Sequence, residues 1–168
     1  LENFFWNFCD NYIELVKVRL YNPEIYGEEA KESAQYACYY TLLEMLKMFG
    51  IYLPHITEEI YQNTFKATQK TESIHNMQLT NLPIDIDKDL IKKGEEVCDV
   101  VSQIRGLKTE SKLSLKTKIK NITITTNNKE FFRTVEDDVK AVTSALEIGY
   151  NEGNTSVKID GFIVEEKA

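Results

Sequence analysis

The first 21 residues constrain the fold more than any other stretch, because they have the pattern of one long amphipathic helix. Apolar side chains recur at steps of three and four and therefore share one helical face. They are Phe5, Phe8, Cys9, Tyr12, Ile13, Val16 and Leu20. An apolar face so rich in aromatic rings needs partner helices to cover it. The pattern therefore predicts a bundle of helices.

Further helices are predicted downstream by the same periodicity. They cover residues 28–49, residues 54–65, and a segment that begins near residue 87 and runs past residue 104. Residues 66–87 are polar and rich in turn formers, which predicts an irregular crossover between the last two helices. Four helices in this order indicate a helical bundle over residues 1–115.

The pattern changes character after residue 115. Residues 119–126 are β-branched and partly alternating, which predicts a strand. A helix is expected over residues 132–146, followed by a short strand to residue 150. Asp160-Gly161 lies between two apolar stretches, which predicts a β-hairpin. The predicted fold is therefore mostly α, a four-helix bundle with a small C-terminal α/β subdomain over residues 116–168.

The charge distribution limits the class of partner. The chain has a net charge of −7, from 20 basic and 27 acidic residues. Residues 92–120 nevertheless carry 8 basic and 4 acidic residues, a local excess of +4. A basic strip of this size can bind a segment of nucleic-acid backbone, but it cannot produce the broad positive field of a dedicated duplex binder. Binding to DNA is therefore not expected.

Basic residues near two helix ends are candidates for such contacts. If the last helix continues, Arg105, Lys108 and Lys112 follow at steps of three and four and form a basic stripe. Lys17 and Arg19 are two positions apart, so they point about 160° away from each other on a helix. They are either contacts to a ligand or a solvated lysine and an arginine whose stem covers apolar surface.

Signatures of catalysis and metal binding are missing from the sequence. It has no CxxC or HExxH zinc motif, no glycine-rich phosphate loop and no GxSxG nucleophile. Glu72 and His75 have the spacing of di-iron carboxylate sites, but they lie in the predicted crossover, and His55 has no matching glutamate. We therefore expect no catalytic residue, no metal site and no cofactor in this segment.

Other features bear on the cellular compartment. Cys9, Cys38 and Cys98 are odd in number and lie at apolar helix positions, which predicts buried thiols and a reducing, cytoplasmic compartment. No apolar run approaches the length of a membrane span, so a membrane partner is not expected. The chain begins without methionine inside a helical pattern, which suggests a piece of a longer protein.

Segments in a fixed order resemble the anticodon-binding domain of valyl-tRNA synthetases. They are residues 5–21 (FWNFCDNYIELVKVRLY), 53–61 (LPHITEEIY), 72–75 (ESIH) and 104–115 (IRGLKTESKLSL). The family usually has Trp-Pro soon after the third segment, whereas this chain reaches Leu82-Pro83 only after several extra residues. The resemblance extends to about residue 115, and the tail resembles the family's small appended subdomain only weakly.

The resemblance implies a function and a parent enzyme. The segment would dock the anticodon stem-loop of valine tRNA for a synthetase that attaches valine to that tRNA using ATP with magnesium. The HIGH and KMSKS signatures that bind ATP are missing here, as expected for a piece C-terminal to the catalytic domain, which would be its protein partner. The alternatives are the equivalent domain of an isoleucyl- or leucyl-tRNA synthetase, and an acidic helical module that binds protein and no RNA.

The candidate RNA-binding residues fall into cations for the backbone and aromatic rings for base stacking. The cations are Arg105, Lys108, Lys112 and Lys116, with Lys17 and Arg19 near the groove of the bundle; the rings are Trp6 and Tyr36. Either ring could instead pack against the bundle.

Overall fold

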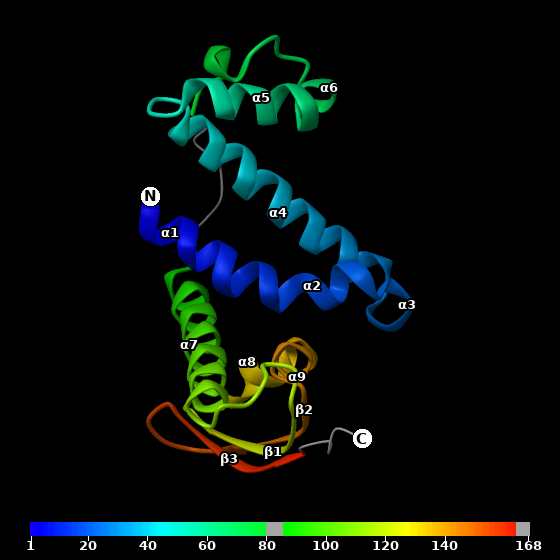
Figure 1. Cartoon of the computed structure of the whole chain (residues 1–168), viewed down its shortest axis with the longest axis vertical. Coiled ribbons are helices and arrows are strands. Elements are labelled where there is room, and N and C mark those ends of the chain that lie inside the picture. The colour runs from blue at the N-terminus through cyan, green and yellow to red at the C-terminus, as the bar shows by residue number, and fades with distance from the viewer. Residues whose placement is uncertain (80–85, 164–168) are drawn as a thin grey trace.

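The computed structural model describes residues 1–79 and 86–163, and it is mostly helical with a small sheet at one end (Figure 1). The helices are α1 (Glu2–Asn7), the π-helical turn η1 (Phe8–Tyr12), α2 (Ile13–Tyr21), α3 (Pro23–Tyr26), α4 (Glu28–Phe49), α5 (Pro54–Thr64), α6 (Lys66–Gln69), the 3-10 turn η2 (Ile74–Asn76), α7 (Lys88–Glu110), α8 (Lys129–Thr134) and α9 (Glu136–Thr143). The strands are β1 (Lys118–Thr125), β2 (Ala145–Asn151) and β3 (Ser156–Ile163). The predicted fold class is confirmed.

The first helix is continuous through α1, η1 and α2, as predicted, but a π-helical turn interrupts its regular period. A π turn holds more residues than an α turn, so it rotates the positions that follow. Phe8 and Val16 are buried as expected, and Leu15 is buried in addition. Ile13 and Leu20 are only half-buried. The prediction places them on the apolar face of an unbroken α-helix, and the π turn changes the positions that follow it.

The smaller of two cores lies at the helical end of the molecule. Helix α4 has the predicted bounds, and α5 begins at Pro54, whose fixed φ suits a first turn. Buried side chains of α4, α5 and the crossover meet here: Leu43, Leu46, Tyr61, Phe65 and Ile74. Glu58 on α5 fixes η2 in place, because its carboxylate accepts hydrogen bonds from the Ser73 hydroxyl at 2.8 Å and the Ile74 amide at 3.0 Å.

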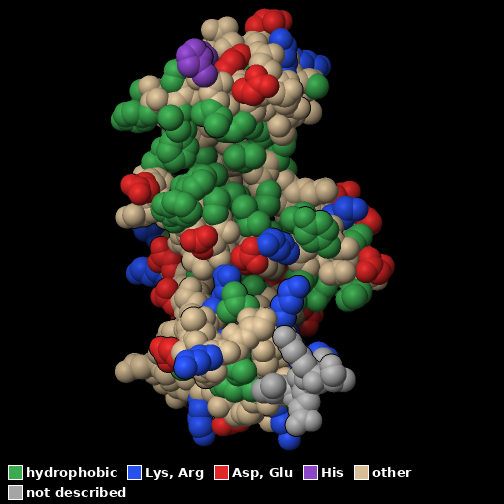
Figure 2. Space-filling view, in the orientation of Figure 1, with side chains coloured by type: hydrophobic (Ala, Val, Ile, Leu, Met, Phe, Trp, Pro, Cys, Tyr) green, Lys and Arg blue, Asp and Glu red, His purple; other side chains and the backbone are tan. Residues whose placement is uncertain are grey.

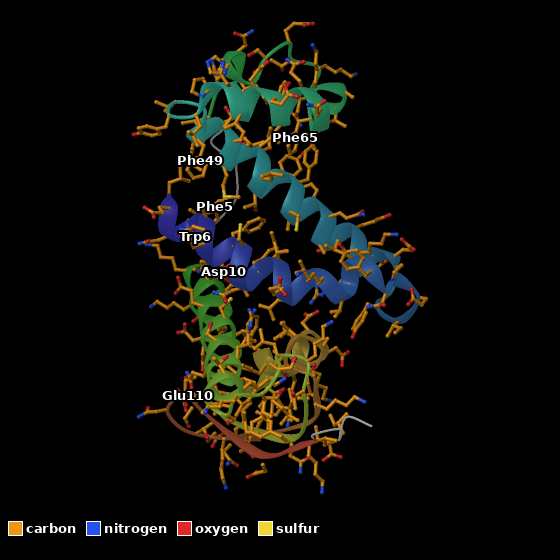
Figure 3. The ribbon with its side chains drawn as sticks, viewed as in Figure 1. Phe5, Trp6, Asp10, Phe49, Phe65 and Glu110 are labelled. Atoms are coloured by element: carbon orange, nitrogen blue, oxygen red, sulfur yellow. The ribbon has the colours of Figure 1, made fainter. Side chains whose placement is uncertain are left out.

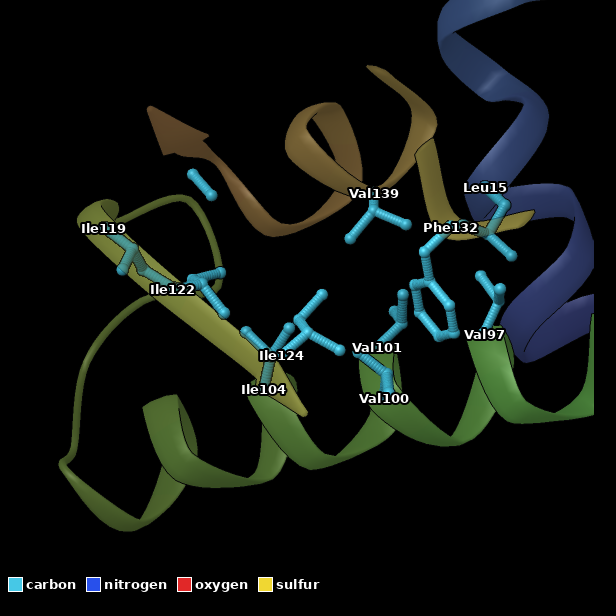
Figure 4. Close-up of a cluster of buried hydrophobic side chains, with 11 residues drawn as sticks. Leu15, Val97, Val100, Val101, Ile104, Ile119, Ile122, Ile124, Phe132 and Val139 are labelled. Atoms are coloured by element: carbon cyan, nitrogen blue, oxygen red, sulfur yellow. The ribbon is translucent and has the colours of Figure 1, made fainter. Parts of the chain in front are cut away.

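The larger core lies between α7 and the sheet (Figure 4). The carboxylate of Asp87 caps α7 by accepting hydrogen bonds from the amides of Asp89 and Leu90. The buried face of α7 carries Val97, Val100, Val101 and Ile104, which pack with Ile119, Ile122, Ile124, Phe132 and Val139. Helix α7 thus shares its core with the C-terminal elements. The division at residue 115 stays a prediction, and this core runs across it.

The sheet has the strand order β2-β1-β3, with β1 parallel to β2 and antiparallel to β3. The predicted hairpin at Asp160-Gly161 is wrong. Strand β3 runs straight through these two residues, with Asp160 beside Asn121 of β1. Gly161 has φ +85°, so the glycine serves a local change of backbone direction within the strand. Part of the predicted second arm, residues 164 and 165, lies outside the described residues.

The helix expected over residues 132–146 is two short helices, α8 and α9, and β2 begins at Ala145. Within residues 1–79 and 86–163, no helix is both long and apolar enough to cross a membrane.

Candidate nucleic-acid interface

The predicted basic stripe on α7 does not form. Helix α7 ends at Glu110, and Lys112 follows in a turn with φ +57°. The guanidinium Nη1 of Arg105 donates a hydrogen bond to the backbone carbonyl of Asp10 at 3.0 Å, which ties α7 to η1. The three cations therefore face different surroundings, because the helix ends before the stripe is complete.

Lys108 points into the protein, where its side chain is 1% exposed. Its Nζ donates hydrogen bonds to the backbone carbonyls of Leu115 at 2.8 Å, Thr117 at 2.7 Å and Thr143 at 2.6 Å. Burial lowers the pKa of this amine, while the three carbonyls satisfy its donors. The amine is not available to a phosphate, so we exclude Lys108 from the RNA contacts predicted from the sequence. It holds the α7–β1 connection and the end of α9 together.

Lys112 and Lys116 both lie in the connection between α7 and β1, and both are exposed. Lys108 anchors this connection from the protein interior, since two of the carbonyls that its Nζ binds belong to the connection. Two of the predicted cations, four positions apart in the sequence, are thus presented on a short, tethered loop. The tether limits the entropy that this loop would lose on binding a ligand.

Arg19 forms an ion pair with Asp138 of α9, a residue 119 positions away in the sequence. Its Nε donates to Oδ1 of Asp138 at 2.8 Å and its Nη2 donates to Oδ2, which is the bidentate geometry favoured by arginine and carboxylate. The hydrogen bond to Asp138 raises the pKa of the guanidinium above its ordinary value. The side chain of Asp138 is buried, so the pair joins α2 to the C-terminal elements.

Lys17 is exposed and forms an ion pair with Glu14 one turn earlier on α2. Exposed pairs of this kind contribute little to stability and are readily exchanged for another partner. Of the two cations on α2, Lys17 is therefore the one whose charge is open to a ligand.

Trp6 and Tyr36 are both exposed, at 54% and 65% of their surface. Trp6 meets Phe5 edge-on, with ring centroids 5.2 Å apart, and Phe5 in turn meets Phe49 at the end of α4 (Figure 3). Tyr36 packs against Tyr40 on the next turn of α4, with centroids 4.4 Å apart. Each ring is supported on one side and open on another, as a stacking platform requires.

A largely apolar cavity of about 470 Å³ lies beside the ion pair of Arg19 and Asp138. Phe8, Leu15 and Phe131 are among the side chains that line it. Arg19 and Asp138 in its wall satisfy each other, Glu95 is the third charged residue that lines it, and most of its lining is apolar. Within the described residues, no group of three or more His, Cys, Asp or Glu side chains could hold a metal ion.

Comparison with known proteins decides the family. A sequence model described as the anticodon-binding domain of tRNA ligase matches residues 1–124. This chain belongs to that family. The valine-tRNA ligase of Ehrlichia ruminantium is 35% identical over 98% of this chain and 20% of its own length. The valine-tRNA ligase of Thermococcus kodakarensis is 35% identical over 83% of this chain and 16% of its own length. That of Rickettsia felis is 32% identical over 95% of this chain and 18% of its own length.

The chain spans about a fifth of the length of these curated relatives. The four segments that predicted the resemblance lie on α1 to α2, at the start of α5, at the start of η2, and on the end of α7 with the connection that follows it, and all fall within the matched residues 1–124. The resemblance is therefore confirmed. The matched region also reaches β1, so the anticodon-binding family unit includes part of the sheet that closes the larger core.

Proposed function

We propose that this chain is the anticodon-binding part of a valine-tRNA ligase and that it docks the anticodon stem-loop of valine tRNA. The match of the family model, together with relatives that are valine-tRNA ligases, carries the proposal. The parent enzyme joins valine to its tRNA in the cytoplasm using ATP with magnesium. The groups that bind ATP belong to its catalytic domain, and this segment positions the tRNA.

The backbone of the stem-loop contacts Lys112, Lys116 and Arg105, with Lys17 as a further cation on α2. Phosphate contacts fix the register of an RNA on a protein, so cations on tethered elements suit this task. Arg19 adds less positive charge than expected, because Asp138 neutralises it. This assignment keeps the predicted cations that the fold exposes and leaves out Lys108.

Bases of the anticodon loop stack on Tyr36, with Trp6 as a second platform. Stacking of a base on an aromatic side chain contributes about 1–3 kcal/mol. The exposed face of Tyr36 and its support by Tyr40 favour this role. Edges of the splayed bases would then be open to hydrogen bonding, which is how single-stranded RNA is read.

The catalytic domain and the other parts of the parent polypeptide cover the apolar surface at the helical end. Figure 2 shows hydrophobic side chains gathered over α1, α4 and α5. The exposed residues there include Leu1, Phe4, Trp6, Ile51, Tyr52, Leu53 and Ile56. Contiguous apolar surface of this kind typically marks a protein interface. Trp6 belongs to this surface, so its stacking role requires that the parent leaves it open.

The deciding experiment measures the affinity of the chain for three RNAs at one stated salt concentration. They are valine tRNA, the same tRNA with its anticodon bases exchanged, and an unrelated tRNA. We expect tighter binding of the first. Equal binding of all three would contradict anticodon reading by this segment. Tighter binding of isoleucine or leucine tRNA would reassign the domain, and loss of all RNA binding would favour a protein-binding module.

A further inference from the structure

The positive charge of residues 92–120 is not spread evenly over the surface. Lys93 pairs with Asp89 at 2.6 Å, Lys108 is buried, and Arg105 is bound to a backbone carbonyl. The exposed lysines in the second half of the segment follow one another at close spacing: Lys112, Lys116, Lys118 and Lys120. The fold thus moves the basic surface from α7 to the connection and to β1.

One face of the sheet packs on α7, and no helix or strand of the described residues covers the other. Ile119, Ile122 and Ile124 of β1 are fully buried on the covered side. The spacing of three between Ile119 and Ile122 leaves two successive residues, Lys120 and Asn121, on the outer side of the core. The alternation of buried and exposed side chains along β1 therefore breaks at Lys120 and Asn121.

Strand β3 breaks its own alternation at the same level, and it adds Lys158 to the same face. Asp160 and Gly161, the pair opposite Asn121 and Lys120, are both exposed. Lys158 lies beside Thr123 of β1, and its side chain is 77% exposed. In Figure 2, Lys and Arg side chains project from the lower edge of the molecule, where Figure 1 places the sheet.

The charged groups on the open face favour an anionic ligand. Lys118, Lys120 and Lys158 lie on this face together with Glu147 and Asp160, and Lys112 and Lys116 lie in the connection that leads into β1. The pair of Lys158 and Asp160, at 3.4 Å, is exposed, so it costs little to exchange for a phosphate. Glu147 has its own partner when the Asn121 amide is turned to donate to it at 3.0 Å.

We propose that the open face of the β2-β1-β3 sheet is a second contact site for the phosphate backbone of tRNA. The proposal rests on the proposed function and extends it to elements beyond the helices. The threonine hydroxyls at positions 123 and 125 supply neutral donors beside the lysines, a mixture typical of phosphate contacts. The described part of the face bears no aromatic ring, so the site holds the backbone and does not read bases.

The test uses the whole chain and compares two triple variants. The first replaces Lys118, Lys120 and Lys158 by glutamine. The matched control replaces Lys66, Lys70 and Lys88, which lie on α6, just after it and at the start of α7, and so removes the same charge elsewhere. Binding of valine tRNA and of its anticodon-exchanged form is measured by fluorescence anisotropy between 20 and 200 mM salt, values chosen to resolve the logarithmic salt slope. Thermal unfolding checks that both variants fold.

We expect the sheet variant to reduce the salt slope by roughly two to three units, because each lysine that contacts a phosphate contributes about one. The preference for the native anticodon should persist, and the control should keep the slope of the unaltered chain. A sheet variant that behaves as the control would overturn the proposal, and so would an unaltered chain that binds no RNA at 20 mM salt. Loss of anticodon preference in the unaltered chain, with the sheet effect intact, would instead remove only the anticodon-reading function.

Discussion

The two ends of the molecule treat their apolar side chains in opposite ways. At the α/β end, the larger core is buried between α7, the sheet, α8, α9 and Leu15 of α2, and lysines occupy the open face of the sheet. At the helical end, the smaller core leaves exposed aromatic and aliphatic side chains over α1, α4 and α5 (Figure 2). The difference shows that the α/β end buries most of its apolar side chains within the chain, with Leu15 of α2 added to its core, whereas the helical end presents a surface suited to a partner.

Substitution of one phenylalanine in each core should show most directly whether the two ends unfold separately. Phe132 and Phe65 are both almost fully buried, so replacing either by alanine should lower the free energy of unfolding by about 3–5 kcal/mol. If the two ends are separate cooperative units, Phe132→Ala removes amide exchange protection from α7 and β1, and Phe65→Ala removes it from α5 and α6. Hydrogen exchange measures both. The same loss pattern in the two variants would show one cooperative unit.

Lys108→Met should cost about 2–4 kcal/mol, because it leaves three backbone carbonyls without their donor. Methionine keeps a stem of similar length, so lost packing contributes little. Urea denaturation measures the effect, and Lys112→Met is the matched control, since that side chain is exposed and its change should stay within about 0.5 kcal/mol. Equal stability of the two variants would mean that water replaces the amine.

The pair of Arg19 and Asp138 tests how firmly the helical end is joined to the α/β end. Arg19→Met leaves the buried carboxylate of Asp138 without a partner and should cost about 2–3 kcal/mol. Asp138→Asn should cost less, because Arg19 is 28% exposed in its side chain and can reach water. A double-mutant cycle by urea denaturation gives the coupling. A larger loss for Asp138→Asn would reverse the assignment of which partner is desolvated.

Local features of the fold were predictable, and the features that depend on distant contacts were not. The bounds of α4 and the start of α7 follow from the helical period, from glycine, and from the capping residue Asp87. The strand through Asp160-Gly161 was misjudged because a turn signal is local, while pairing with β1 depends on residues about 40 positions away. The same limit applies to the π turn, which no residue pattern announced.

The candidate site shows the same division. Exposure of Lys17 agrees with its interpretation as a solvated residue on the helix flank, whereas the sequence left open whether Trp6 and Tyr36 pack against the bundle, and both are exposed. The burial of Lys108 depends on carbonyls of the connection and of α9, and the pairing of Arg19 depends on a carboxylate in the tail. A charge count found the basic segment but could not tell which of its lysines the fold exposes, because that depends on tertiary packing.

The smallest effect should come from Glu96, which joins α7 to the loops at the ends of β1 and β3. Burial alone would raise the pKa of its carboxyl, but hydrogen bonds from Thr126, Thr155 and Asn128 outweigh it and hold the pKa below its ordinary value. Because the folded-state pKa lies below the unfolded value of about 4.3, this stabilisation is complete above about pH 5 and disappears as the pH falls through the folded-state pKa.

Glu96→Gln should therefore lower stability by about 1 kcal/mol at pH 7 and should make the chain less sensitive to acid below about pH 5. Urea denaturation at a series of pH values measures both effects. The matched control is Glu95→Gln, which changes the same charge at an exposed neighbouring position. An equal loss of acid sensitivity in the control would assign the effect to net charge. A loss confined to Glu96→Gln would show that the α/β end is closed by this carboxylate as well as by its apolar core.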